Sequence, residues 1–279
     1  VEVALSTRNV HTKNFMWTTN FNFAYNNNKV LKEALREDAL EPGREGYPAG
    51  ALFALKTAGL DEEGYPMFQD KDGKAVSAME FFKLQEWGFG ATDLTARERR
   101  ELYTYVGTAD CPYTGGYNNT FTYKAFELGV NFSFDFGGKV RSQPTYSIVD
   151  FDKGRNTNRD ILNRWTPENT ETIFPVLLSQ NERLDEYMWY SNQNEIYRNL
   201  DIWIRDLNYV RLQNIRLGYT LPTNFSRTLG MTSATVAIEG RNLLVFGSSY
   251  KNYLDPETMS NAYATPAPKS VTLSLNLIF

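Results

Sequence analysis

The sequence predicts an all-β protein: roughly ten antiparallel strands of the transmembrane β-barrel type, separated by long loops. Three observations support this class. Several segments alternate apolar and polar residues with the period of two that strands require. Aromatic residues make up 14% of the chain, which suits a barrel with an aromatic outer wall. No segment approaches the ~18 consecutive apolar residues of a transmembrane helix, so strands would have to make any crossing.

Composition narrows the classes of function. The net charge of -4 does not favour nucleic acid as a partner. His11 and Cys111 are the only histidine and cysteine, which excludes a disulfide framework and a zinc site with several histidines. Val1–Leu5 lacks the basic and apolar regions of a signal peptide. We therefore expect the chain to begin within a longer one, or to be the product of cleavage or of a split gene.

The first two strands are predicted near the start of the chain. From Asn14 to Asn27, aromatic residues occupy odd positions, and mostly Asn, Thr and Ala occupy even ones. Because successive side chains of a strand point to opposite faces, one face is aromatic and the other is small or polar. Val1–Thr7 is the predicted partner strand, joined through a turn at Arg8–Val10.

A second hairpin is predicted from Tyr117–Tyr123 and Phe126–Phe136, with its turn at Lys124–Ala125. Gly137–Gly138 predicts a bend, after which Lys139–Val149 continues the strand. Two more hairpins follow. Their strands and turns are Ile202–Leu212 and Ile215–Leu221 around Gln213–Asn214, then Ser233–Gly240 and Leu243–Tyr250 around Arg241–Asn242.

The last predicted strand, Ser270–Phe279, alternates most regularly. Its length matches the ~9–11 residues of a tilted membrane-crossing strand. The even positions are polar, and the odd positions are Val271, Leu273, Leu275, Leu277 and Phe279.

Long polar segments, Glu33–Asp61 and Asp150–Tyr197, alternate with the short turns, as expected for a barrel with long external loops. Val76–Trp87 and Thr95–Tyr105 have helical character, and Asp93 or Thr95 is the predicted cap of the second. Asp70–Gly73 resembles the opening of a calcium loop. Position twelve of that pattern is Phe81 instead of Glu, so a plain Asp-Gly turn is favoured.

Six segments in a consistent order, with the closing strand, resemble one family. They are Asp110–Tyr117, Tyr123–Phe126, Trp165–Asn169 (WTPEN), Tyr209–Pro222 (YVRLQNIRLGYTLP), Gly240–Leu243 (GRNL) and Asp255–Glu257 (DPE). Together they resemble the SusC/RagA group of TonB-dependent outer-membrane transporters. Cys111 interrupts the first motif, between its Asp and its Pro.

The resemblance implies that residues 1–279 are the C-terminal part of a barrel of roughly 22 strands with a plugged lumen. The plug and the N-terminal strands are absent here and are expected on another chain or segment. An open set of strands would leave unpaired edge N–H and C=O groups, which lipid cannot satisfy.

The same resemblance implies import of an oligosaccharide or a peptide across the outer membrane of a Gram-negative bacterium. A SusD-like surface lipoprotein would cover the long loops, Glu33–Asp110 and Asp150–Tyr197. TonB–ExbB–ExbD would supply energy through the plug. Neither a cofactor nor an enzymatic activity is expected. Acidic pairs such as Glu168 and Glu171 are common in acidic loops and do not by themselves indicate a glycosidase.

Two groups of site residues are predicted. The odd residues of the last strand, Val271, Leu273, Leu275, Leu277 and Phe279, resemble the insertion signal that the barrel-assembly machinery reads. In the loops, Trp165, Trp189 and Tyr190 are candidate contacts for ligand or lid. Loop packing or an interfacial aromatic belt is the favoured alternative for these three rings.

Two other functions stay open from the sequence. A soluble all-β carbohydrate-binding module would bury its apolar face and purify without detergent. A passive porin would lack the plug, so the companion segment would distinguish it from an active importer.

Overall fold

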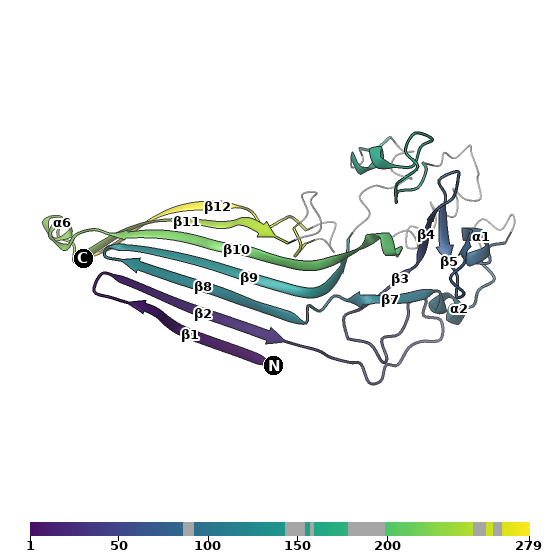
Figure 1. Ribbon diagram of the computed structural model, residues 1–279, viewed down its shortest axis with the longest axis horizontal. Helices are drawn as coiled ribbons and strands as arrows, with labels where there is room; N and C mark the ends of the chain where they lie inside the picture. Colours follow the sequence, from purple (N-terminus) through teal and green to yellow (C-terminus); the bar gives the residue numbers. More distant parts are fainter. Residues whose placement is uncertain (86–91, 143–153, 157–158, 178–198, 248–254, 259–263) are drawn as a thin grey trace.

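A computed structural model describes residues 1–279 except 86–91, 143–153, 157–158, 178–198, 248–254 and 259–263. Its main feature is one long antiparallel sheet of seven strands (Figure 1). Further short strands lie in two small sheets, so fewer strands than the roughly ten expected line up side by side. The seven strands are, in sheet order, β1 (Glu2–His11), β2 (Phe15–Tyr25), β8 (Tyr113–Tyr123), β9 (Phe126–Arg141), β10 (Ile204–Thr220), β11 (Ser233–Phe246) and β12 (Ser270–Ile278).

The pairing register aligns the alternating residues into two different faces. Phe21 of β2 lies opposite Tyr117 of β8, and Tyr117 lies opposite Phe132 of β9. The row continues through Leu212 of β10 to Leu244 of β11. We call this side the aromatic face. The opposite side, the polar face, carries Asn, Ser, Thr and charged residues, as the alternation predicts.

Two polar side chains interrupt the aromatic face and are buried there. Thr19 of β2 and Asn119 of β8 lie opposite each other in the ladder. The Asn119 Oδ1 atom accepts hydrogen bonds from the Thr19 hydroxyl at 2.8 Å and from the Trp17 indole N–H at 2.9 Å. These bonds reduce the cost of placing polar groups among aromatic rings.

The predicted turn at Lys124–Ala125 is confirmed: β8 ends at Tyr123, and β9 begins at Phe126. Lys124 has a φ of 53°, as a tight turn between two strands requires. The turn predicted at Arg8–Val10 is wrong. β1 runs on to His11, and Asn9 is an extra residue that shifts the register between Arg8 and Val10.

Both later hairpin predictions are wrong for the same reason. β10 is one strand of 17 residues through Gln213–Asn214, and β11 is one strand of 14 residues through Arg241–Asn242. Each predicted turn is a β-bulge: the register shifts between Leu212 and Asn214, with Asn242 at a φ of 53° on the facing strand. A bulge changes which face the next residues occupy without reversing the chain.

The predicted bend at Gly137–Gly138 is also an irregularity within a continuous strand. β9 runs through both glycines to Arg141, and Gly137 has a φ of 83°. The Gly137 N–H donates to the Asn208 Oδ1 atom at 2.7 Å. Residues 143–149 of the predicted continuation lie outside the described residues.

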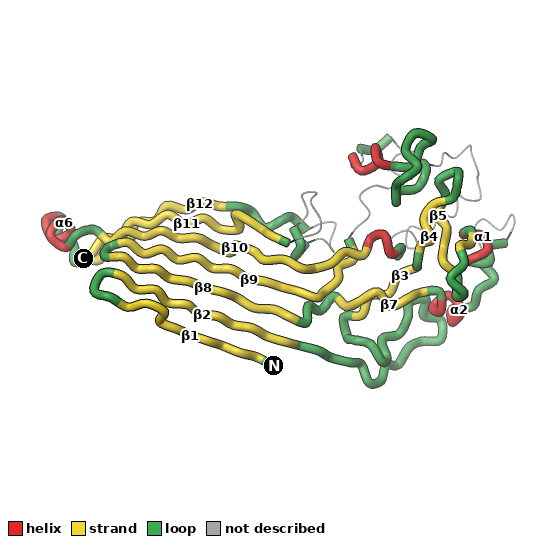
Figure 2. The backbone as a smooth tube through the Cα atoms, viewed as in Figure 1, coloured by secondary structure: helices red, strands yellow, loops and turns green. Residues whose placement is uncertain are grey.

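The long segments leave the sheet at one end, and the short turns lie at the other (Figure 2). Described parts of the long segments pack into a small outer unit. Its strands and helices are β3 (Ala51–Leu55), β4 (Thr57–Leu60), β5 (Pro66–Gln69), β6 (Ala75–Val76), β7 (Tyr103–Thr108), α1 (Ala78–Phe81) and α2 (Ala96–Glu101). The remaining elements are the 3-10 turns Arg159–Asn163 and Asp201–Trp203, and α6 (Thr223–Thr228) beside the short turns.

Residues far apart in sequence form the core of the outer unit. Leu55, Phe68, Leu200 and Trp203 are all at most 2% exposed. The cap predicted at Thr95 is confirmed, because Thr95 and Glu98 form a capping box at the start of α2. Both helices are shorter than the sequence suggested. Among the described residues, no helix is long and apolar enough to cross a membrane.

Candidate functional site

Charged side chains of opposite sign lie next to each other on the polar face. Arg216 of β10 contacts Glu127 of β9 at 3.1 Å. On β11, Arg241 contacts Glu239 at 2.6 Å. At least one side chain of each pair is more than half exposed, and exposed ion pairs contribute only ~0–1 kcal/mol each. They therefore indicate a hydrated surface more than a source of stability.

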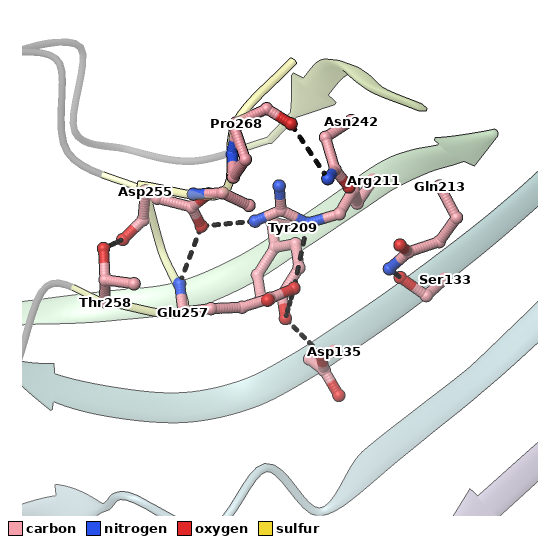
Figure 3. A network of polar contacts seen from close by, with 11 residues as sticks. Ser133, Asp135, Tyr209, Arg211, Gln213, Asn242, Asp255, Glu257, Thr258 and Pro268 are labelled. Carbon is pink, nitrogen blue, oxygen red and sulfur yellow. Dashed lines mark hydrogen bonds and ion pairs between the residues drawn. The ribbon is translucent and has the colours of Figure 1, made fainter. Parts of the chain in front are cut away.

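A more deeply buried cluster lies on the same face around Arg211 of β10, nearer than Arg216 to the end of the sheet from which the long segments leave (Figure 3). Arg211 is only 1% exposed. Its guanidinium group contacts the carboxylate of Asp255, and its Nε atom lies 2.9 Å from the Glu257 Oε1 atom. The Tyr209 hydroxyl lies 2.5 Å from the Asp135 Oδ2 atom and 3.1 Å from the same Glu257 oxygen. The cluster thus joins strands β9 and β10 to the segment between β11 and β12.

The bulge at Gln213 allows Tyr209 and Arg211 to reach the polar face. After the bulge, toward Thr220, even-numbered residues such as Asn214 and Arg216 face this side. Before the bulge, the odd-numbered residues Tyr209 and Arg211 do. Gln213 itself donates to the Ser133 hydroxyl oxygen at 2.7 Å. A strand without the extra residue would turn Tyr209 and Arg211 toward the aromatic face, because a one-residue shift exchanges the two faces.

Asp255 connects the cluster to both described arms of the segment that precedes β12. Its carboxylate accepts the backbone N–H of Glu257 at 3.1 Å and that of Ala267 at 3.3 Å, in addition to the Arg211 guanidinium. Burial alone would raise the pKa of Asp255. The hydrogen bonds from Arg211 and from the two backbone N–H groups outweigh burial, so the pKa lies below its usual value. Asp255 is therefore ionised at neutral pH.

The predicted residues of the last strand all lie on β12 or directly after it. Val271, Leu273, Leu275 and Leu277 share the aromatic face and lie opposite residues of β11. β12 is the last strand of the sheet, and within the described residues it pairs only with β11. Phe279 follows the strand and is 82% exposed.

The predicted loop residues are placed only in part. Trp165 is half-buried in the outer unit, and its ring packs so closely on Gly64 that an added Cβ atom would lie 2.5 Å from it. Trp189 and Tyr190 lie outside the described residues. Trp165 packs against Gly64 in the outer unit, whereas the Arg211 cluster lies on the sheet (Figure 3).

Sequence reasoning missed the Arg211 cluster as a site. One signal was present: two of the six family-like segments carry residues of opposite charge, Arg211 in one and Asp255 and Glu257 in the other. Their meeting needs the fold, because Arg211 and Asp255 are 44 residues apart.

Residues that sequence patterns associate with metals have other partners. The Asp70 Oδ1 atom accepts the backbone N–H groups of Asp72 at 3.0 Å and Lys74 at 2.8 Å. Gly73 has a φ of 82°, so this stretch is a tight turn between β5 and β6. In the part of the chain that the structure describes, no group of three or more His, Cys, Asp or Glu could hold a metal ion.

Sequence comparison finds relatives over the whole chain. TonB-dependent receptor P3 of Formosa agariphila is 26% identical over 306 residues, which cover 100% of this chain and 28% of that receptor. TonB-dependent receptor SusC of Bacteroides thetaiotaomicron is 22% identical over 299 residues, which cover 99% of this chain and 26% of SusC. The chain thus spans little more than a quarter of the length of these relatives, and no family model matches it.

Solved structures share the fold. The RagAB peptide transporter matches with a TM-score of 0.71 at 21% identity, over 99% of this chain and 28% of that one. The RagAB peptide importer in its 'closed-closed' state matches with a TM-score of 0.63 at 20% identity, over 99% of this chain and 29% of that one. The chain therefore has the fold of one segment of such a transporter.

Proposed function

We propose that this chain, a homologue of one segment of the TonB-dependent receptors that include SusC, forms the C-terminal part of an outer-membrane β-barrel that imports nutrients. The two-faced sheet carries the proposal. Large apolar side chains remain exposed along the aromatic face, for example Leu273 at 76% and Leu275 at 62%. Such a surface is unfavourable in water and favourable in lipid. The polar face, with its exposed ion pairs, suits a water-filled interior.

The open edges of the sheet support a larger barrel. β1 and β12 are the outermost strands of the sheet, and in the described part of the chain each pairs on one side only. Lipid cannot satisfy the free N–H and C=O groups of such an edge. We propose that further strands, to a total of roughly 22, complete the wall around a plug.

The proposed cargo is an oligosaccharide or a peptide. One relative is the TonB-dependent receptor SusC, and the similar solved structures are described as the RagAB peptide transporter or importer. The proposed partners are a SusD-like lipoprotein on the outer unit, TonB–ExbB–ExbD through the plug, and the barrel-assembly machinery during insertion. The relatives are receptors and transporters, and we propose no enzymatic activity for this chain.

The carbohydrate-binding module is the weaker alternative. A β-sandwich covers its apolar face with a second sheet. In the described residues, the seven-stranded sheet has no second sheet of similar size to pack against its aromatic face.

Fractionation and uptake test the proposal. We expect the protein in the outer-membrane fraction, released only by detergent, and migrating differently on a gel before and after heating. Deleting it should abolish growth on, and uptake of, one class of glycan or peptide. Recovery of a water-soluble protein without detergent would refute the barrel. A membrane-embedded protein whose loss affects no energy-dependent uptake would favour the passive porin.

A further inference from the structure

The chain between β11 and β12 returns to the sheet and is fastened there. We call residues 255–258 and 264–269 of this connection, which the structure describes, the return segment. They lie against the polar face at the level of Arg211 (Figure 3). A connection between Phe246 and Ser270 is long enough to extend away from the sheet, which we call the wall. The contacts below keep its described residues on the wall.

The first contact is a buried ion pair. The side chains of Arg211 and Asp255 are 2% and 7% exposed. An isolated charge in such a place is strongly unfavourable, so each group requires the other. Glu257, with a side chain 44% exposed, adds a second carboxylate 2.9 Å from the Nε atom of the guanidinium.

Asp255 also fastens the second arm of the return segment. Its Oδ2 atom accepts the backbone N–H of Ala267, twelve residues further along the chain. The Asp255 carboxylate therefore binds the Arg211 side chain of the sheet. It also accepts backbone hydrogen bonds from Glu257 and Ala267, one in each described part of the return segment. Loss of this carboxylate removes three contacts at once.

The bulge in β11 supplies an independent contact. Asn242 has a φ of 53°, a conformation that Asn adopts more readily than most residues. Its side-chain N–H donates to the backbone oxygen of Pro268 at 3.2 Å, two residues before β12 begins. The bulged strand thus guides the return segment into the start of β12.

We infer that Arg211 and Asp255 form a latch that positions the return segment on the polar face. Arg211 is the positioning residue, because its guanidinium holds the segment through Asp255 and Glu257. This inference rests on the proposed function only in that the polar face lines the passage. With the latch closed, the return segment lies along the wall, and the Glu257 carboxylate contacts Arg211 and Tyr209 on the polar face. With the latch broken, the described residues of the segment are no longer held against β10.

Thiol labelling of the purified full-length protein in detergent tests the latch without depending on import. The probe is Thr258→Cys, which is partly buried in the return segment, in a Cys111→Ser background. We measure the rate of its reaction with a bulky maleimide. Asp255→Ala should raise the rate about tenfold or more, because it leaves the buried Arg211 without its main partner.

Two variants of β10 control the experiment. Arg211→Lys keeps the charge but loses the two-pronged geometry of the guanidinium. Its labelling rate should therefore lie between the rates of the parent and of Arg211→Ala. Arg216→Ala removes an exposed ion pair from the same strand and should leave the rate unchanged. Unchanged labelling in both Asp255→Ala and Arg211→Ala would overturn the latch.

A variant that fails to fold does not end the test. The double variant Arg211→Met/Asp255→Leu replaces the buried pair with apolar side chains, which often preserves folding. It should give folded, heat-modifiable protein with fast labelling, and slow labelling would overturn the inference. If labelling follows these expectations but the parent protein imports nothing, the latch stands and the proposed function fails.

Discussion

The membrane-facing assignment of the aromatic face predicts opposite outcomes for two neighbouring lysine substitutions on β12. Leu275 lies near the middle of the strand, on the aromatic face, and is 62% exposed. Asn276 is the next residue, is also exposed, and points to the polar face opposite Thr235. Both positions therefore accept a long side chain sterically, and only the medium around them differs.

The expected loss of unfolding free energy follows from the cost of placing a charge in the hydrocarbon of the bilayer. A lysine on the lipid face of a barrel costs ~2–4 kcal/mol at the middle of the bilayer and less near its surfaces. Leu275→Lys should thus lower the free energy of unfolding by ~2–4 kcal/mol, a change of roughly 30- to 1000-fold in the folding equilibrium. Asn276→Lys should change it by less than ~0.5 kcal/mol, as expected for a solvated surface substitution.

Urea unfolding of the complete protein in lipid vesicles, followed by tryptophan fluorescence and by heat-dependent migration, measures both values. Vesicles with thinner bilayers serve as a control, because they should reduce the cost of Leu275→Lys. Equal effects of the two substitutions would show that the aromatic face does not contact hydrocarbon. A larger effect of Asn276→Lys would show that the polar face is the dry one.

Three further predictions concern single residues. Phe279→Ala should lower the amount of heat-modifiable barrel in the outer membrane, if the aromatic residue after β12 acts as an insertion signal; a normal amount would contradict that role. Asp255 has a lowered pKa, so its stabilisation is complete above the unfolded value of ~3.9 and is lost as the pH falls through the lower folded value. The urea midpoint should accordingly fall more steeply below about pH 4 in the parent than in Asp255→Asn, and parallel curves would argue against this contribution. Gly115→Ala should destabilise the sheet by ~1–3 kcal/mol, because its Cβ atom would meet the backbone oxygen of Asn22 and the ring of Phe134. Gly129→Ala is the matched control and should be nearly neutral, because nothing lies within 4 Å of its Cβ position. Equal denaturation midpoints of the two variants would refute the steric reasoning.

Local alternation determined much of the long sheet. β2, β8, β9 and β12 lie where aromatic or apolar residues alternate with polar ones, since a strand with one apolar and one polar face requires that pattern. The turn at Lys124–Ala125 and the cap at Thr95 were also predictable, because both depend on a few neighbouring residues. The order of six family-like segments indicated the correct group of relatives.

Pairing across the sheet decided what local sequence left ambiguous. At Gln213–Asn214 the alternation changes phase, and a tight turn or a bulge produces the same change in the sequence. Arg241–Asn242 interrupts the alternation of β11 without changing its phase, because Ile238 and Leu244 both lie on the aromatic face. Only the ladders that β10 forms with β9 and β11 show that the chain continues straight on. The bulge at Gln213 then places Arg211 on the polar face.

The sequence by itself thus determined the class of fold and the two faces of the sheet, because period-two alternation is a local property of the chain. Only the tertiary structure decided the strand lengths, the core of the outer unit and the Arg211–Asp255 pair. Leu55 packs near Trp203, and Arg211 meets Asp255, across separations at which no short-range pattern survives. Contacts of that kind depend on how whole strands pair and how long segments return to them.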